Sequence, residues 1–194
     1  MKDYFHIAML GQTGVGKSTL INYMVGEQVR EVGTGLPVTK KGFHTIEVNL
    51  EGMHINLTDA WGIEQGKLEE WEKTVKKFHK KQPIQLAIYC IDASSTRVQA
   101  TDLKIIHDLQ QQQIPVITVL TKANTIAQAD ITKMAQLLPT HVIAVNSKRE
   151  QYFDGTIAQA FGRERVIEQI RQHYTIPTTK KKRRFGGMRF GKNK

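Results

Sequence analysis

Gly11-Gln12-Thr13-Gly14-Val15-Gly16-Lys17-Ser18 decides the fold of this chain, because it has the spacing of a phosphate-binding loop. That spacing is glycine, four residues and then Gly-Lys-Ser. Residues 7–10 before it are continuously apolar, which predicts a buried strand. Residues 18–24 after it place apolar side chains on one side of a helix. A strand, the loop and a helix in this order are the context that the motif requires.

The residue types of the loop suit the phosphates of a nucleotide. Glycines let the backbone wrap a phosphate without Cβ clashes, and the helix N-terminus adds a partial positive charge. Lys17 is predicted to reach the β- and γ-phosphates, and Ser18 to bind Mg2+. The alternative is a glycine-rich turn with a chance lysine. The nucleotide-binding residues predicted here are Gly11, Gln12, Thr13, Gly14, Val15, Gly16, Lys17, Ser18 and Thr19.

The composition is that of an ordinary globular domain. Hydrophobic residues make up 40% of the 194 residues and charged residues 24%, enough for one full core. No apolar stretch is long enough to span a bilayer, and the first strand leaves no room for a signal peptide. Cys90, the single cysteine, excludes a disulfide framework and is expected to be a buried strand residue rather than a nucleophile. These features predict a cytoplasmic protein.

Apolar periodicity predicts alternating strands and helices. Alternation at residues 45–50 and 53–58 predicts a hairpin that turns at Glu51-Gly52. Further strands are predicted at 86–91, 116–120 and 142–145, and helices at 67–80, 98–111, 130–138 and 156–174. Ile157 and Phe161 are expected to contact the core from the last helix. The fold class predicted is α/β in three layers: a doubly wound, mostly parallel six-stranded sheet with one antiparallel edge strand.

Four further stretches fall near the strand ends, where α/β sheets bind ligands. Asp59 can hold Mg2+ through water, and Gly62 in the same stretch can offer its N–H to a γ-phosphate. Thr39 can bind Mg2+ only when a γ-phosphate is present, which would make a switch. Two stretches after later strands are expected to reach the base: Thr121-Lys122-Ala123-Asn124 and Val145-Asn146-Ser147-Lys148.

In order and spacing, these five motifs resemble those of the Era-like small GTPases, a branch of the translation-factor class. The resemblance covers residues 4–174, and Gly33-Thr34-Gly35-Leu36-Pro37-Val38-Thr39 has the form of the bacterial Pro-Val-Thr switch. Thr34 and Thr45 compete with Thr39 as the switch threonine, and the distance to Asp59 favours Thr39.

The resemblance implies a Mg2+-dependent enzyme that binds GTP and GDP and hydrolyses GTP. It implies catalytic roles for Lys17, Thr39 and Gly62, and Mg2+ ligation by Ser18, Thr39 and Asp59. It implies contacts to the base from Thr121, Lys122, Asn124, Asn146, Ser147 and Lys148. Members often dimerise through the nucleotide face, so a homodimer of that kind is a further expectation.

The chain departs from the family pattern at three places. Asn124 replaces an aspartate whose two oxygens accept from guanine, and an amide offers only one acceptor, so a weaker preference for guanine over xanthine is expected. Ile63 stands where Ras-like members carry the glutamine that orients water, so hydrolysis is expected to be slow or stimulated by a partner. The third departure, Asn146-Ser147 in place of Ser-Ala, is mild because that motif acts mainly through a backbone N–H.

The net charge of +10 belongs mainly to the C-terminal end. Residues 180–194 hold eight of the 28 basic residues and no acidic one, which leaves 20 basic against 18 acidic residues elsewhere. The predicted division is a nucleotide-binding domain at 1–176 and a basic, disordered tail at 177–194. Basic residues with Phe185 and Phe190 between them suit RNA or the ribosome; an anionic membrane surface and a simple solubility tail are the alternatives.

Two functions of different class follow. The first is a GTP-binding and GTP-hydrolysing switch that its tail, Lys180 to Lys194, places on RNA or the ribosome. The second is a nucleotide-binding adaptor with little or no hydrolysis, which docks partners or an anionic membrane. The location expected is cytoplasmic, peripheral to a membrane or ribosome.

Overall fold

The computed structural model describes residues 4–26, 42–64 and 66–175. Thr39 and the basic tail lie outside these ranges. The helices and strands are β1 (Phe5–Gly11), α1 (Lys17–Val25), β2 (Phe43–Leu50), β3 (Met53–Ala60), α2 (Leu68–Lys81), β4 (Leu86–Asp92), η1 (Ala93–Ser95), α3 (Ala100–Gln111), β5 (Val116–Thr121), η2 (Ala123–Thr125), α4 (Gln128–Gln136), β6 (His141–Ala144), β7 (Glu150–Gln151), β8 (Ile157–Ala158) and α5 (Arg163–His173). No helix in these ranges is both long and apolar enough to cross a membrane.

The central sheet has six strands in the order β2-β3-β1-β4-β5-β6. All neighbouring pairs are parallel except β2 and β3, which form the predicted hairpin at one edge. The predicted fold class is confirmed. Because β1 lies between β3 and β4, its carboxyl end meets the ends of those strands at one edge of the sheet.

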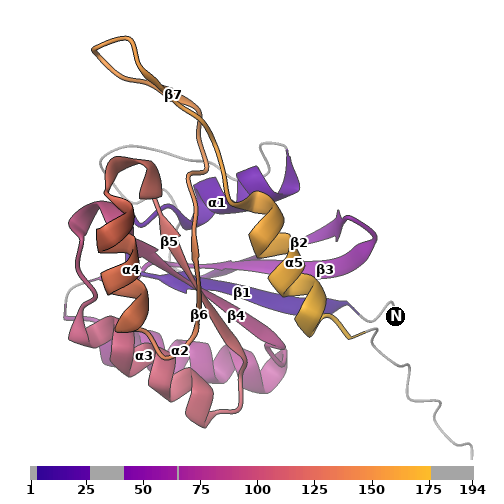
Figure 1. The fold of residues 1–194 in the computed structure, drawn as a ribbon. Helices are drawn as coiled ribbons and strands as arrows, with labels where there is room; N and C mark the ends of the chain where they lie inside the picture. Colours follow the sequence, from indigo (N-terminus) through magenta and orange to yellow (C-terminus); the bar gives the residue numbers. More distant parts are fainter. Residues whose placement is uncertain (1–3, 27–41, 65, 176–194) are drawn as a thin grey trace, which may run out of the picture.

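Helices cover both faces of the sheet (Figure 1). The alternation of β1 places Phe5, Ile7 and Met9 on the face that α1 and α5 cover, where they pack with α1 and α5 side chains. Ala8 and Leu10 belong to the opposite core, to which α2, α3 and α4 contribute. Cys90 is buried as predicted, and burial raises the pKa of its thiol to about 12, which keeps the thiol protonated.

The structure contradicts the prediction for residues 156–162. The expected helix begins only at Arg163, and a short hairpin of β7 and β8 precedes it. Gly162 adopts a left-handed φ of 92° directly before the helix, and a Cβ there would lie 2.6 Å from the Ala144 carbonyl oxygen. Ile157 and Phe161 therefore do not enter the core, and they are 44% and 40% exposed. The other predicted boundaries differ from the observed ones by one or two residues.

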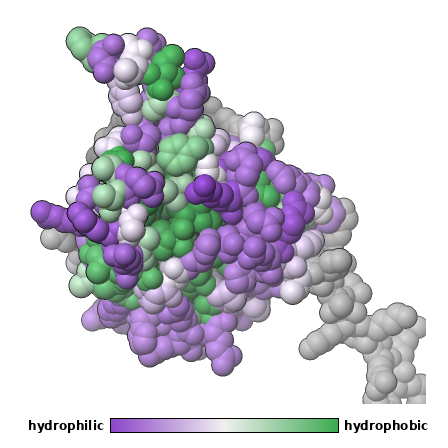
Figure 2. All heavy atoms as spheres, viewed as in Figure 1, coloured by the Kyte–Doolittle hydropathy of each residue, from purple (hydrophilic) through white to green (hydrophobic). Residues whose placement is uncertain are grey.

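The β7–β8 hairpin projects from the body of the domain beyond α1 (Figure 1). Its turn carries Phe153, which is fully exposed, and Figure 2 shows hydrophobic side chains on this projection. The root of the hairpin is fixed to the domain, because Asn146 and Phe161 exchange backbone hydrogen bonds of 3.2 and 2.9 Å. The hairpin thus extends from the end of β6, beside the predicted base-binding stretches.

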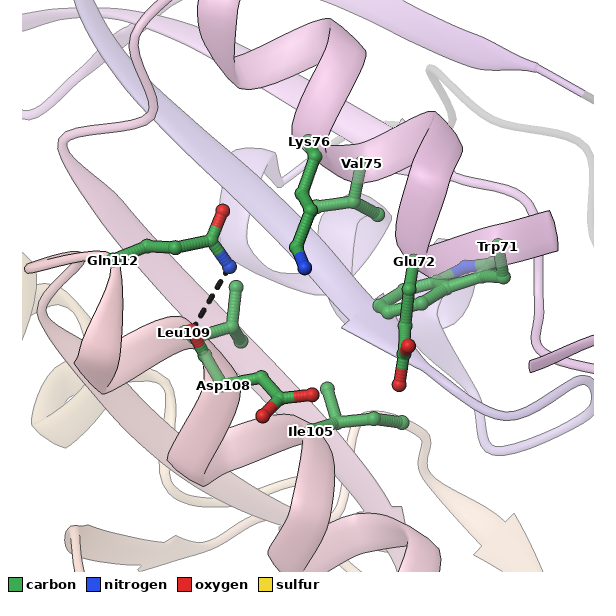
Figure 3. A pocket seen from close by; sticks show the side chains of 8 residues that line it. All are labelled: Trp71, Glu72, Val75, Lys76, Ile105, Asp108, Leu109 and Gln112. Carbon is green, nitrogen blue, oxygen red and sulfur yellow. Dashed lines mark hydrogen bonds between the residues drawn. The ribbon is translucent and has the colours of Figure 1, made fainter. Parts of the chain in front are cut away.

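A small hollow lies between α2 and α3 (Figure 3). Trp71 and Val75 of α2 face Ile105 and Leu109 of α3 there, and the volume is about 10 Å³. Lys104 of α3 pairs with Glu72 of α2 and with Asp108. A space of this size holds at most about one water molecule, so we interpret it as a packing defect between two helices rather than a ligand site.

Candidate nucleotide-binding site

The phosphate loop connects β1 to α1 in a conformation that needs glycine. Gly11 has a φ of 139°, and a Cβ there would lie 2.4 Å from the carbonyl oxygen of Cys90 on β4. Gly16, with a φ of 92°, precedes α1, and no side chain caps that helix N-terminus. The amides of the first turn are therefore left for an anion, which is the arrangement that binds phosphate.

Lys17 lies along this loop. Its ammonium donates to the carbonyl oxygens of Gly11 at 3.1 Å and Gln12 at 2.8 Å. The side chain is almost fully buried, and burial lowers the pKa of Lys17 from its usual value. A cation held by the loop backbone in this way is positioned for phosphate oxygens.

The side chain of Gln12 points away from the loop. Its amide donates to Asp102 at 3.2 Å, and this buried carboxylate also accepts from the Tyr89 hydroxyl at 2.9 Å. No sequence motif predicts these contacts of Asp102 and Tyr89. Gln12 can therefore contribute to phosphate binding through its backbone only, with its side chain fixing the loop to the start of α3.

Ser18 and Asp59 form the predicted pair for Mg2+. The Ser18 hydroxyl donates to Asp59 Oδ2 at 2.9 Å, and Asp59 is fully buried in β3. The described ranges contain no group of three His, Cys, Asp or Glu side chains that could hold a metal by itself. One carboxylate, one hydroxyl, phosphate oxygens and water are nevertheless the oxygen ligands that Mg2+ takes at nucleotide sites. The residues present therefore fit Mg2+ bound together with a nucleotide.

Gly62 and Ile63 lie directly against the phosphate loop. The Thr13 amide donates to the Ile63 carbonyl, and the Ile63 amide donates to the Gly11 carbonyl, both at 3.3 Å. A Cβ on Gly62 would lie 2.4 Å from the Thr13 hydroxyl oxygen, so this approach requires glycine. The side chain of Ile63 is buried among apolar side chains, and so only the backbone of this residue makes polar contacts with the loop.

Two side chains of the stretch after β5, which is predicted to bind the base, form hydrogen bonds to the phosphate loop. The Thr121 hydroxyl donates to the Val15 carbonyl at 2.5 Å. The Lys122 ammonium bonds to the Gly14 carbonyl at 3.1 Å and to Asp92 at 2.5 Å. Despite the desolvation of Asp92, its hydrogen bonds to Lys122 and Ser94 keep the pKa of the carboxyl below its usual value. Asp92, at the end of β4, is a partner of Lys122 that no sequence motif predicted.

A pocket of about 150 Å³ opens between these stretches and the loop. It is lined by Gly16, Thr19, Thr121, Lys122, Asn124, Thr125, Asn146, Ser147, Lys148 and Glu150. Eight of these ten residues were predicted from sequence, and Thr125 and Glu150 were not. Asn146 is buried and shapes the wall, because its amide nitrogen donates to the carbonyls of Lys148 at 2.7 Å and Gln159 at 2.8 Å.

A phosphate loop, a Ser–Asp pair suited to Mg2+ and an adjoining pocket at one edge of the sheet define a P-loop nucleotide-binding domain. A family model described as a 50S ribosome-binding GTPase matches residues 6–122. The probable GTP-binding protein EngB of Aquifex aeolicus is 30% identical over 161 residues, which span 76% of this chain and 84% of that protein. The chain belongs to this family of P-loop GTPases.

Other relatives agree with this membership. The GTPase Era of Caldicellulosiruptor saccharolyticus is 29% identical over 132 residues, 68% of this chain. This chain spans only 44% of that protein, less than half its length. The solved structure of Toc33 from Arabidopsis thaliana in complex with Mg2+ and GMPPNP has a TM-score of 0.69 at 18% identity, over 89% of this chain and 85% of that one. This last likeness concerns the fold alone.

Proposed function

We propose that this protein is a Mg2+-dependent GTPase that acts as a molecular switch. The observation that carries the proposal is the direct bonding of Thr121 and Lys122 to the phosphate loop. These contacts hold the base pocket and the phosphate cradle at a fixed separation, as one nucleoside phosphate requires. Membership of a GTPase family and the names of the relatives support GTP as the nucleotide.

Each residue of the site would have its own role in hydrolysis. Lys17 and the first amides of α1 would stabilise negative charge on the β- and γ-phosphates. Mg2+, when bound, neutralises the phosphate charge, and Ser18, Asp59 and the proposed third ligand Thr39 would hold it. Gly62 would offer its amide to the γ-phosphate. Because the side chain of Ile63 offers no polar group to orient water, we expect hydrolysis to be slow until a partner supplies one.

The Mg2+ ligands give a first test. The wild-type protein should release phosphate from GTP over many turnovers with Mg2+ and not with EDTA. Asp59→Asn should raise the Mg2+ concentration needed for half-maximal release by about tenfold, because a charged ligand becomes a neutral one. Thr39→Ala should weaken binding of a non-hydrolysable GTP analogue and spare GDP. Release that persists in EDTA would contradict the proposal, and nucleotide binding without any release would favour the adaptor function.

We further propose that the switch acts on the ribosome or another RNA through residues 177–194. The eight basic residues from Lys180 to Lys194 and the description of the matching family support this partner. Removing 177–194 should lower cosedimentation with ribosomes and flatten its salt dependence, because fewer counterions are released. GDP affinity should stay unchanged. Loss of sedimentation with anionic vesicles instead would assign the tail to a membrane, and no change with either would make it a bystander.

A further inference from the structure

The lining of the base pocket includes a residue of β7, a strand that the sequence motifs do not predict. Glu150 of β7 lines the pocket together with the stretches that follow β5 and β6. Two residues further on, the hydroxyl of Tyr152 accepts a hydrogen bond from the amide nitrogen of Asn124 at 2.6 Å. Asn124 is the residue that replaces the usual base-reading aspartate.

In the structure, the Asn124 amide uses its nitrogen for the bond to Tyr152. A planar amide carries its donor and its acceptor on opposite sides, so turning the nitrogen toward Tyr152 turns the oxygen away from it. Within the described part of the chain, the Asn124 oxygen has no hydrogen-bond partner, and the residue lines the pocket. Asn124 therefore presents an acceptor to a bound base, rather than the donor that would oppose guanine's exocyclic amine.

Tyr152 is itself held by the backbone of the hairpin. Its amide donates to the Thr156 carbonyl at 2.8 Å, and its carbonyl accepts from the Gly155 amide at 2.9 Å. The Asp154 carboxylate closes the turn by accepting from the Thr156 amide and hydroxyl at 2.9 and 2.6 Å. This tight turn holds the backbone of Tyr152, whose hydroxyl accepts the bond from Asn124.

Glu150 and Tyr152 contact the same pocket in different ways. Glu150 of β7 lines it, and Tyr152, the residue directly after β7, bonds to Asn124 in its wall. No ion pair or side-chain hydrogen bond engages Glu150 within the described residues. Its carboxylate is an acceptor only, and so it suits an amine donor and repels a carbonyl oxygen.

We infer that the β7–β8 hairpin restores guanine recognition: Tyr152 in its turn orients Asn124 so that the Asn124 oxygen accepts one guanine donor, and Glu150 accepts the other. Guanine presents its imino N–H and its exocyclic amine side by side, so two acceptors from two residues replace one aspartate carboxylate. Xanthine carries a carbonyl in place of the amine and would face the Glu150 carboxylate unfavourably. This inference rests on the proposed binding of guanine nucleotides, and it reverses the expectation of weak guanine preference.

Removing the Glu150 carboxylate tests the contact to the amine. Calorimetric titration should show that Glu150→Ala weakens GDP binding by about tenfold, the loss of one charge-assisted hydrogen bond. Binding of IDP should change little, because its base lacks the exocyclic amine. The matched control is Gln151→Ala, which removes a neighbouring side chain on the other side of the strand and should leave both affinities unchanged.

Removing the Tyr152 hydroxyl tests the positioning of Asn124. In Tyr152→Phe the freed amide can turn its donor toward the base, so the ratio of GDP to XDP affinity should fall by about tenfold. If Tyr152 only supported the local structure, Tyr152→Phe would lower the affinities for GDP and XDP together and leave their ratio unchanged. Phe153→Ala is the control, since this side chain is fully exposed at the same turn.

A second substitution should restore the GDP affinity that Glu150→Ala removes. Asn124→Asp supplies two acceptors from one residue, so adding it to Glu150→Ala should return GDP affinity to within about threefold of the wild type. Unchanged GDP/IDP and GDP/XDP ratios in both single variants, or a wild type that prefers XDP, would overturn the inference and leave nucleotide binding standing. A wild type that binds none of the three nucleotides would instead refute the proposed function.

Discussion

Lys17→Ala should reduce the affinity for GDP and GTP by at least about 100-fold, since hydrogen bonds to charged groups contribute about 1.5–3 kcal/mol each and several are lost together. Lys17 is almost fully buried and is held by the carbonyls of Gly11 and Gln12, so no other cation can take its place from solvent. Calorimetric titration with GDP in the presence of Mg2+ measures the loss.

The matched control is Lys133→Ala. Lys133 lies on α4, is largely exposed, and pairs only with Asp130 in the described part of the chain. It carries the same charge as Lys17 but lies outside the site, so its removal should leave the GDP affinity unchanged. Circular dichroism should show both variants folded. An affinity of Lys17→Ala equal to that of the wild type would reject the assignment of the phosphate loop.

Gly11→Ala should destabilise the fold by about 3 kcal/mol or more, the sum of backbone strain and overpacking. Its φ of 139° is unsuited to an L side chain, and the added Cβ would lie 2.4 Å from the Cys90 carbonyl oxygen. That oxygen belongs to β4, which pairs with β1 in the middle of the sheet, so the backbone cannot give way without breaking the pairing. Urea denaturation without nucleotide measures the loss in the free energy of unfolding.

Gly14→Ala separates backbone strain from overpacking as causes of the lost stability. Gly14 also has a positive φ, of 80°, but a Cβ there would meet no atom within 4 Å. It should therefore cost only the strain of the left-handed backbone, about 1–2 kcal/mol. Equal losses in the two variants would mean that backbone strain alone, and not the contact with β4, makes glycine necessary at position 11.

The parts of the nucleotide site that could be predicted are those that depend only on short sequence patterns. The glycine spacing and the neighbouring apolar run identified the phosphate loop between β1 and α1. Asp59 and Gly62 were predicted because they follow a strand that alternates with period two, and the structure places them against Ser18 and Thr13. Ligands bind at the carboxyl ends of strands in α/β sheets, so these positions could be predicted without knowing the rest of the fold.

The segment before α5 was predicted wrongly because its local pattern is ambiguous. Ile157 and Phe161 have the spacing of one helix face, and nothing in their neighbourhood opposes a helix except Gly162. Whether that glycine weakens a helix or begins one depends on a contact with Ala144, eighteen residues earlier in the chain. This contact exists only once β6 and α5 have packed.

The sequence by itself determined the class of this protein, because the phosphate loop, the strand ends and the apolar periods are short-range patterns with direct structural meaning. Only the tertiary structure decided which side chains surround the proposed base-binding residues. Asp92 is joined to Lys122, and Tyr152 to Asn124, by hydrogen bonds between residues about thirty positions apart. Polar residues in loops carry no periodic signal, so only the folded chain shows that Tyr152 contacts Asn124 and that Glu150 lines the pocket.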